Sequence, residues 1–145
     1  MPECEFPKKN ATSDEIAQIL RSSKTIAVIG LSPKPERPSH GVSAYMKSQG
    51  YTIIPVNPGQ KEILGETCYP SLLEVPGPVD IVDIFREPGA VPEIVEQAIA
   101  KKAKVIWMQE GIVHNEAAEK ARSAGLQVVM NKCIYKEHAR LRQDE

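Results

Sequence analysis

One loop in the first third of the chain carries the residues whose types best suit chemistry. It follows the apolar run Thr25–Ile29 and is rich in proline, serine and basic residues. Hydroxyl groups and cationic side chains beside the unpaired N–H groups of a helix start favour a bound anion, phosphate above all. The candidate anion ligands are Ser32, Lys34, Arg37, Ser39 and His40, and the resemblance described below adds Gly30 and Pro33 to the same loop.

We expect Ser39 to be the N-cap of a helix over residues 39–49. The alternative is a stiff surface connection without function, because prolines reduce loop entropy and basic residues favour solvent. The length of the loop favours function, since connections in α/β units usually span about 2–6 residues. The loop by itself therefore predicts an anion site but does not identify the anion.

The loop lacks the glycine patterns of two common nucleotide-binding classes. A dinucleotide fingerprint needs G-x-G-x-x-G here and an acidic residue after the next strand. In this chain the next glycine after Gly30 is Gly41, and Asn57 follows the second strand. The P-loop pattern is absent as well. Ordinary NAD binding is therefore disfavoured, and a kinase or ATPase has no support.

Other reactive side chains are few and scattered. Cys4, Cys68 and Cys133 are odd in number and widely spaced, which argues against a disulfide framework and a structural zinc site. The three histidines show no metal-ligand spacing. Glu110 is either a general base or a plain loop acid, and nothing beside it in sequence explains a shifted pKa. We therefore assign no catalytic residue and no metal ligand.

Alternating helical and apolar segments must position these residues. Strands are predicted over residues 25–29, 52–56, 79–85, 104–108 and 126–130, and helices over residues 12–21, 39–49, 91–101, 116–124 and 135–141. Unbroken apolar strands that alternate with helices of about ten residues indicate an α/β fold. We expect one Rossmann-like, doubly wound domain, with a mainly parallel sheet of about five strands flanked by helices. Pro55 cannot donate to a ladder, so the second strand is expected near an edge.

Length and charge exclude several classes of function. The 145 residues fit a single domain over 1–145, of which 1–11 are expected to form a flexible tail. The net charge of −1 gives no global field for nucleic acid or an anionic membrane, so any basic site is local. No apolar run approaches the ~20 residues that cross a bilayer, and no signal peptide is evident, so we expect a cytoplasmic protein.

Ligands of such sheets bind outside the carboxyl ends of the strands. We expect five turns, over residues 30–32, 57–59, 86–89, 109–111 and 131–133, to line one crevice. Phe85 and Met108 end two of the strands, where an apolar side chain either packs on a ligand or fills the interior. Residues 57–78 lose any period, and we interpret them as an excursion across this edge.

An ordered set of motifs resembles the small, single-domain coenzyme A-binding proteins. The set is V-I-G-L-S-P-K-P-E-R-x-S, V-N-P-G, L-G-E-T-C-Y-P-S-L, V-D-I-V-D-I-F-R, W-M-Q-E-G-I and N-K-C, and it covers about residues 14–141. The chain is also similar to the N-terminal coenzyme A-binding domain of the succinyl-coenzyme A synthetase α subunit. That second resemblance runs through residues 57–59, 64–65 and 110–112.

The resemblance implies coenzyme A as the ligand. It places the loop from Gly30 to His40 around the phosphates. It places Asn57 and Pro58 beside the nucleotide, and the pantetheine arm along Phe85, Arg86, Met108, Gln109 and Glu110. Cys133 follows the fifth strand beside Lys132, and a neighbouring cation favours the thiolate. We hypothesise that it forms a mixed disulfide with coenzyme A under oxidation.

Two departures limit what the resemblance implies. The synthetase-like domain has lysine after the P-G turn, where this chain has Gln60 followed by Lys61. Its catalytic phosphohistidine belongs to a second domain. We therefore expect a non-catalytic module that binds coenzyme A or an acyl-coenzyme A. The sequence leaves open whether the chain forms a homo-oligomer or binds another protein. The alternatives are a subunit of an acyl-coenzyme A ligase and an NAD(P)-dependent oxidoreductase.

Overall fold

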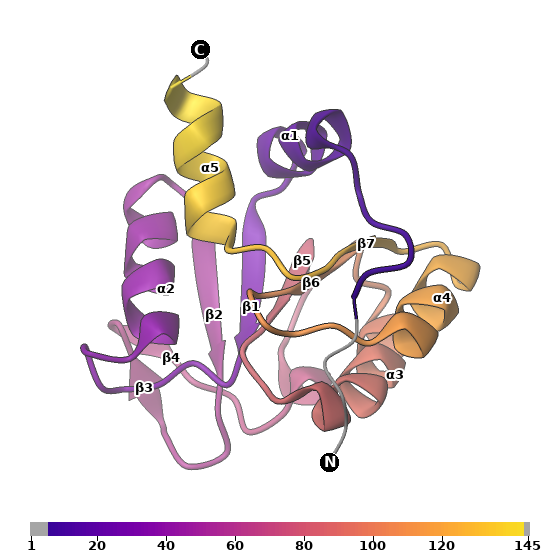
Figure 1. Cartoon of the computed structure of the whole chain (residues 1–145). Coiled ribbons are helices and arrows are strands. Elements are labelled where there is room, and N and C mark those ends of the chain that lie inside the picture. The colour runs from indigo at the N-terminus through magenta and orange to yellow at the C-terminus, as the bar shows by residue number, and fades with distance from the viewer. Residues whose placement is uncertain (1–5, 144–145) are drawn as a thin grey trace.

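The apolar runs form one parallel sheet between two layers of helices (Figure 1). The structure is a computed structural model, and it describes residues 6–143. The strands of the sheet are β1 (Thr25–Ile29), β2 (Thr52–Val56), β5 (Ile81–Ile84), β6 (Val105–Met108) and β7 (Gln127–Val129). The helices are α1 (Ser13–Ser22), α2 (Pro38–Ser48), α3 (Val91–Lys101), α4 (Asn115–Ser123) and α5 (Ile134–Gln143). The predicted Rossmann-like α/β fold is confirmed.

The strand order places a switch point in the middle of the sheet. The order is β2-β1-β5-β6-β7, and every neighbouring pair is parallel. The chain adds β2 on one side of β1 and then continues with β5 on the other side. In open α/β sheets, ligands bind outside the carboxyl ends of the strands at such a point. The carboxyl ends of β1 and β5 are therefore the first place to look for a site.

Both faces of the sheet are buried, which explains why the strand sequences are apolar along almost their whole length. One core cluster joins the sheet to α3 and α4, and it includes Val82, Val95 and Ala118. The other joins the sheet to α1, α2 and α5, and it includes Met46 and Trp107. Figure 1 shows α1, α2 and α5 on one side of the sheet and α3 and α4 on the other.

The segment after β2 forms short elements that the sequence pattern does not predict. A hairpin pairs β3 (Glu62–Ile63) with β4 (Glu66–Thr67), and one turn of 3-10 helix, η1, spans Leu72–Glu74. Tyr69 then lies along the outer side of β2, where its N–H donates to the Pro55 carbonyl over 3.0 Å and its carbonyl accepts from Asn57 N–H over 2.9 Å. The expectation that β2 lies at an edge of the main sheet is confirmed.

The N-terminal segment is bound at the other edge of the sheet, beside β7. Residues 1–5 of the expected tail lie outside the described residues. Within residues 6–11, the Asn10 side chain donates to the Met130 carbonyl and accepts from its N–H, each over 2.8 Å. Thr12 then begins α1 with a capping box, in which Thr12 and Glu15 each accept from the other's backbone N–H. In the part of the chain that is described, no helix combines the length and the apolar character that crossing a membrane requires.

Candidate functional site

Three hollows meet at the carboxyl ends of β1 and β5. The β1 hollow, of about 290 Å³, is lined by Gly30, Ser32, Lys34, Arg37, Pro38, Ser39 and Phe85. The β2–β5 hollow, of about 500 Å³, includes Asn57 and Pro58 and also reaches α3. The β5–β6 hollow, of about 500 Å³, includes Gln109, Glu110 and Cys133. Gly30, Phe85 and Arg86 each line two of them, so the three hollows adjoin one another.

Gly30 stands at the centre of this site, and only glycine suits its position. Its φ is +88°, a conformation that other residues rarely adopt. A Cβ added there would lie 2.8 Å from the Phe85 carbonyl oxygen and 3.1 Å from Cδ of Arg86. The chain therefore turns out of β1 in close contact with the end of β5.

Two serines fold the loop after β1. The Ser39 hydroxyl oxygen accepts from Ser32 N–H over 2.9 Å, and the Ser32 hydroxyl oxygen accepts from Lys34 N–H over 3.1 Å. Neither hydroxyl group donates a hydrogen bond to another residue within 6–143. The expectation that Ser39 is the N-cap of α2 is wrong, because Arg37 occupies that position and Pro38 is the first helical residue. Proline is preorganised for that place and lacks the N–H that would be unpaired there.

The charged side chains that line the β1 hollow are both basic. Lys34 and Arg37 are exposed, and neither forms an ion pair with any residue in 6–143. No acidic residue lines this hollow within the same range. In a chain with a net charge of −1, this is a local concentration of positive charge at the start of α2. Such a place attracts an anion.

Asn57 connects the loops that follow β1 and β2. Its Nδ2 donates to the Leu31 carbonyl over 2.9 Å, and its Oδ1 accepts from Gly59 N–H over 2.8 Å. Pro58 lies next to it in the lining of the β2–β5 hollow. The amide of Asn57 is therefore used inside the protein, and its contribution to a ligand is to fix the wall of the hollow.

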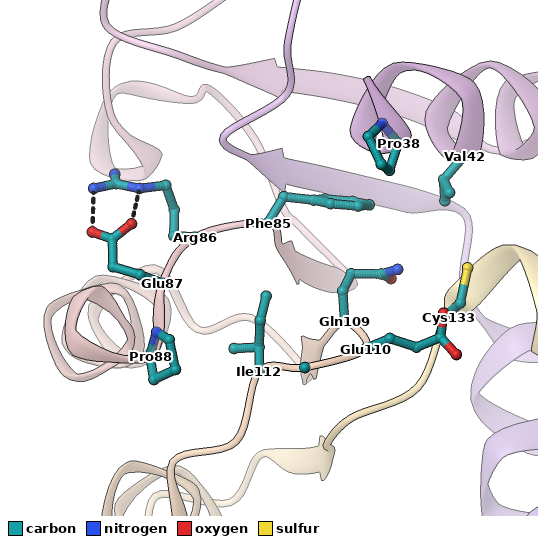
Figure 2. Close-up of a pocket in the computed structure, with 11 residues that line it drawn as sticks. Pro38, Val42, Phe85, Arg86, Glu87, Pro88, Gln109, Glu110, Ile112 and Cys133 are labelled. Atoms are coloured by element: carbon teal, nitrogen blue, oxygen red, sulfur yellow. Dashed lines mark hydrogen bonds and ion pairs between the residues drawn. The ribbon is translucent and has the colours of Figure 1, made fainter. Parts of the chain in front are cut away.

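The β5–β6 hollow combines apolar, amide and thiol groups. Figure 2 shows Phe85 and Gln109 extending into the same space, with the sulfur of Cys133 on one side. At the opposite side, Arg86 forms an ion pair with Glu87, with 3.0 Å between Nη2 and Oε1. These two side chains are exposed, so the pair borders the hollow without closing it.

Three of the predicted ligand residues line none of the hollows. Met108 is fully buried in the core on the α3 and α4 side. Pro33 is exposed on the loop, and His40 is half-buried on α2. Conversely, Val42 and Ile112 line the β5–β6 hollow although we did not expect them there. The position of Val42 on α2 indicates that it faces the core, but the sequence cannot show that this end of the helix borders a hollow.

One of the buried side chains of the sheet is a carboxylic acid. Asp83 is 1% exposed in the middle of β5, and its Oδ1 makes no hydrogen bond to any described residue. Burial raises the pKa of Asp83 well above its ordinary value. Within residues 6–143, no cluster of three His, Cys, Asp or Glu side chains is arranged to hold a metal ion.

Comparison with known proteins identifies the family. The family described as "CoA binding domain" matches residues 24–139. Uncharacterized protein YneT of Bacillus subtilis is 44% identical over 131 residues, which are 90% of this chain and 97% of YneT. A hypothetical protein from Pyrococcus horikoshii OT3 has the same fold with a TM-score of 0.89 at 45% identity, covering 98% of this chain and 99% of that one.

Larger proteins contain a related segment. ADP-forming acetate–CoA ligase I subunit alpha of Pyrococcus furiosus is 31% identical over 128 residues. The match covers 77% of this chain but only 28% of that subunit. The chain therefore belongs to the CoA-binding domain family and is related to the alpha subunit of ADP-forming acyl-CoA ligases.

Proposed function

We propose that this protein binds coenzyme A, or an acyl-coenzyme A, at the carboxyl ends of β1 and β5, with its phosphates in the β1 hollow. The observation that carries the proposal is the basic lining of this hollow, where Lys34 and Arg37 lack ion-pair partners among the described residues. The hydroxyl groups of Ser32 and Ser39 add donors beside them. The family description and the names of the ligase relatives support coenzyme A as the ligand.

The other two hollows suit the rest of such a ligand. The nucleotide would lie beside Asn57 and Pro58 in the β2–β5 hollow. The pantetheine arm would follow Phe85 and Arg86 into the β5–β6 hollow, toward Gln109 and Glu110. This route is continuous because adjacent hollows share Gly30, Phe85 and Arg86. We assign no catalytic step to these residues, so the proposed role is that of a binding module.

Titration calorimetry tests the proposal with coenzyme A, acetyl-coenzyme A, NAD and ADP. Micromolar binding of coenzyme A, about −8 kcal/mol, is expected. Arg37→Ala should weaken it by about ten- to a hundredfold, since hydrogen bonds to charged groups contribute about 1.5–3 kcal/mol. Lys104→Ala is the matched control, because Lys104 pairs with Asp80 at the amino ends of β6 and β5, away from the hollows at the carboxyl ends. Preferential binding of NAD, or equal effects of the two substitutions, would contradict the proposal.

A subunit of an acyl-coenzyme A ligase is the second candidate function. The observation that favours it is the 31% identity to a ligase alpha subunit, of which this chain spans about a quarter. This candidate predicts thioester formation only when the chain is mixed with a further subunit. An NAD(P)-dependent oxidoreductase remains disfavoured by the position of Asn57, where that class has an acid.

A further inference from the structure

Cys133 lies in the β5–β6 hollow at the point where α5 begins. It is 7% exposed and directly precedes Ile134, the first residue of the helix. Its carbonyl accepts from Glu137 N–H over 3.0 Å, as the residue before a helix does. The thiol therefore faces the hollow from a fixed backbone position rather than from a mobile loop.

The residues on both sides of Cys133 are bound to β6. The Lys132 carbonyl accepts from the indole Nε1 of Trp107 over 2.8 Å, and Trp107 is fully buried. On the other side, Ile134 N–H donates to Oε1 of Gln109 over 3.2 Å. These bonds fix the cysteine relative to the end of β6. A sulfur held in this way is preorganised for a reaction with a ligand in the hollow.

Gln109 supplies an independent indication of a ligand. Its side chain is 4% exposed, and its Oε1 is engaged by Ile134. With Oε1 fixed, Nε2 is the remaining end of the amide, and it makes no hydrogen bond to any residue in 6–143. Figure 2 shows this end directed into the space between Phe85 and Cys133. Nε2 is therefore free to donate to an acceptor in the hollow, and the amide carbonyls of a pantetheine arm are acceptors.

The charges near the thiol are balanced. Glu110 forms an ion pair with Lys136 on α5, with 3.0 Å between Oε1 and Nζ. The pKa of Lys136 is raised, mainly by its hydrogen bond to Glu110 and by the negative charge of Glu110, and in smaller part by Cys133. Lys136 therefore stays positive near the sulfur and offsets the carboxylate of Glu110.

We propose that Cys133 captures the thiol end of coenzyme A as a mixed disulfide, by exchange with coenzyme A disulfide. The inference rests on the proposed function, because the ligand must first occupy the site. The Cys133 thiolate attacks one sulfur of the disulfide, which forms the new S–S bond and breaks the old one. The second coenzyme A leaves as a thiolate and takes up the proton that Cys133 released to solvent. A thiol in excess reverses the reaction.

Cys68 is a matched control within the same chain. It is also 7% exposed, but it lines none of the three hollows and its Sγ is directed to the carbonyls of Asn57 and Tyr69. Burial raises the pKa of the Cys68 thiol, which disfavours the reactive thiolate. Burial alone therefore does not distinguish the two cysteines, whereas access to the ligand does.

The test is intact-mass analysis with peptide mapping after incubation with coenzyme A disulfide, and separately with glutathione disulfide. The wild type and Cys68→Ser should each gain one coenzyme A at Cys133, and Cys133→Ser should gain none at that position. The reaction should be about tenfold or more faster with coenzyme A disulfide than with glutathione disulfide, because binding places the sulfurs together. Acetyl-coenzyme A, which has no free thiol, should slow it by competition.

Three results would overturn the inference: equal rates with the two disulfides, an adduct elsewhere than at Cys133, or no adduct. Calorimetry of the wild type with reduced coenzyme A separates this failure from that of the proposed function. If reduced coenzyme A binds but no adduct forms, only the inference about Cys133 is wrong. If reduced coenzyme A does not bind, the proposed function is wrong as well.

Discussion

Replacing Gly30 with alanine should destabilise the protein through two separable effects. The first is conformational, because a residue with a Cβ at a φ of +88° costs about 1–2 kcal/mol. The second is steric, because the new Cβ would lie 2.8 Å from the Phe85 carbonyl oxygen, which is backbone and cannot rotate away. Overpacking of this kind costs about 1–3 kcal/mol. We therefore expect the free energy of unfolding to fall by about 2–5 kcal/mol.

Gly50→Ala isolates the conformational effect. Gly50 has a φ of +99°, but a Cβ added there meets no atom within 4 Å. Urea denaturation followed by circular dichroism should therefore show a loss of only about 1–2 kcal/mol for this variant. For a chain of this size about 3 °C of Tm corresponds to each kcal/mol, so the two variants should also separate in a thermal scan. Equal destabilisation by the two substitutions would refute the contact between the β1 turn and β5.

Two further predictions concern a buried acid and a helix start. The raised pKa of Asp83 means that the folded chain keeps a proton which the unfolded chain loses above about pH 4, so this group lowers stability as pH rises. Asp83→Asn should remove this dependence, which amounts to at most about 1.4 kcal/mol of unfolding free energy per pH unit. Urea denaturation of both proteins at pH 5 and pH 7 tests this, and an equal change in the two proteins would contradict it. Thr12→Ala removes one half of the capping box of α1 and should cost about 1 kcal/mol at pH 7. Ser22→Ala, at the other end of α1, is the comparison in the same denaturation assay, and equal losses would argue against the cap.

The sequence predicts the main sheet well because burial on both faces leaves a simple signal. The strands are mainly apolar, with Asp83 as the buried exception in β5, and the edge position of β2 follows from the missing N–H of Pro55. The hairpin of β3 and β4 escapes prediction, since strands of two residues are too short to show a period. The N-cap of α2 is misplaced by two residues, at Ser39 instead of Arg37, because proline and serine both favour helix starts and Pro38 takes the first helical position.

The candidate site is less predictable than the sheet because it depends on distances between turns. Sequence places Gly30, Asn57 and Gln109 after different strands, and the parallel topology brings them to one edge. The pattern does not show that Met108 turns into the core while the next residue faces the hollow, although strand alternation is consistent with it. The unpaired Nε2 of Gln109 has no sequence signal, since it depends on the bond from Ile134 to the other end of the amide.

The two edges of the sheet also determine how this protein can associate with others. Exposed edge strands invite pairing with further strands, which leads to aggregation. Here Tyr69 covers the outer side of β2 next to Pro55, and Asn10 binds the backbone of Met130 just beyond β7. A strand that pairs with β2 or β7 from outside would therefore have to displace Tyr69 or Asn10 at the carboxyl end of that edge.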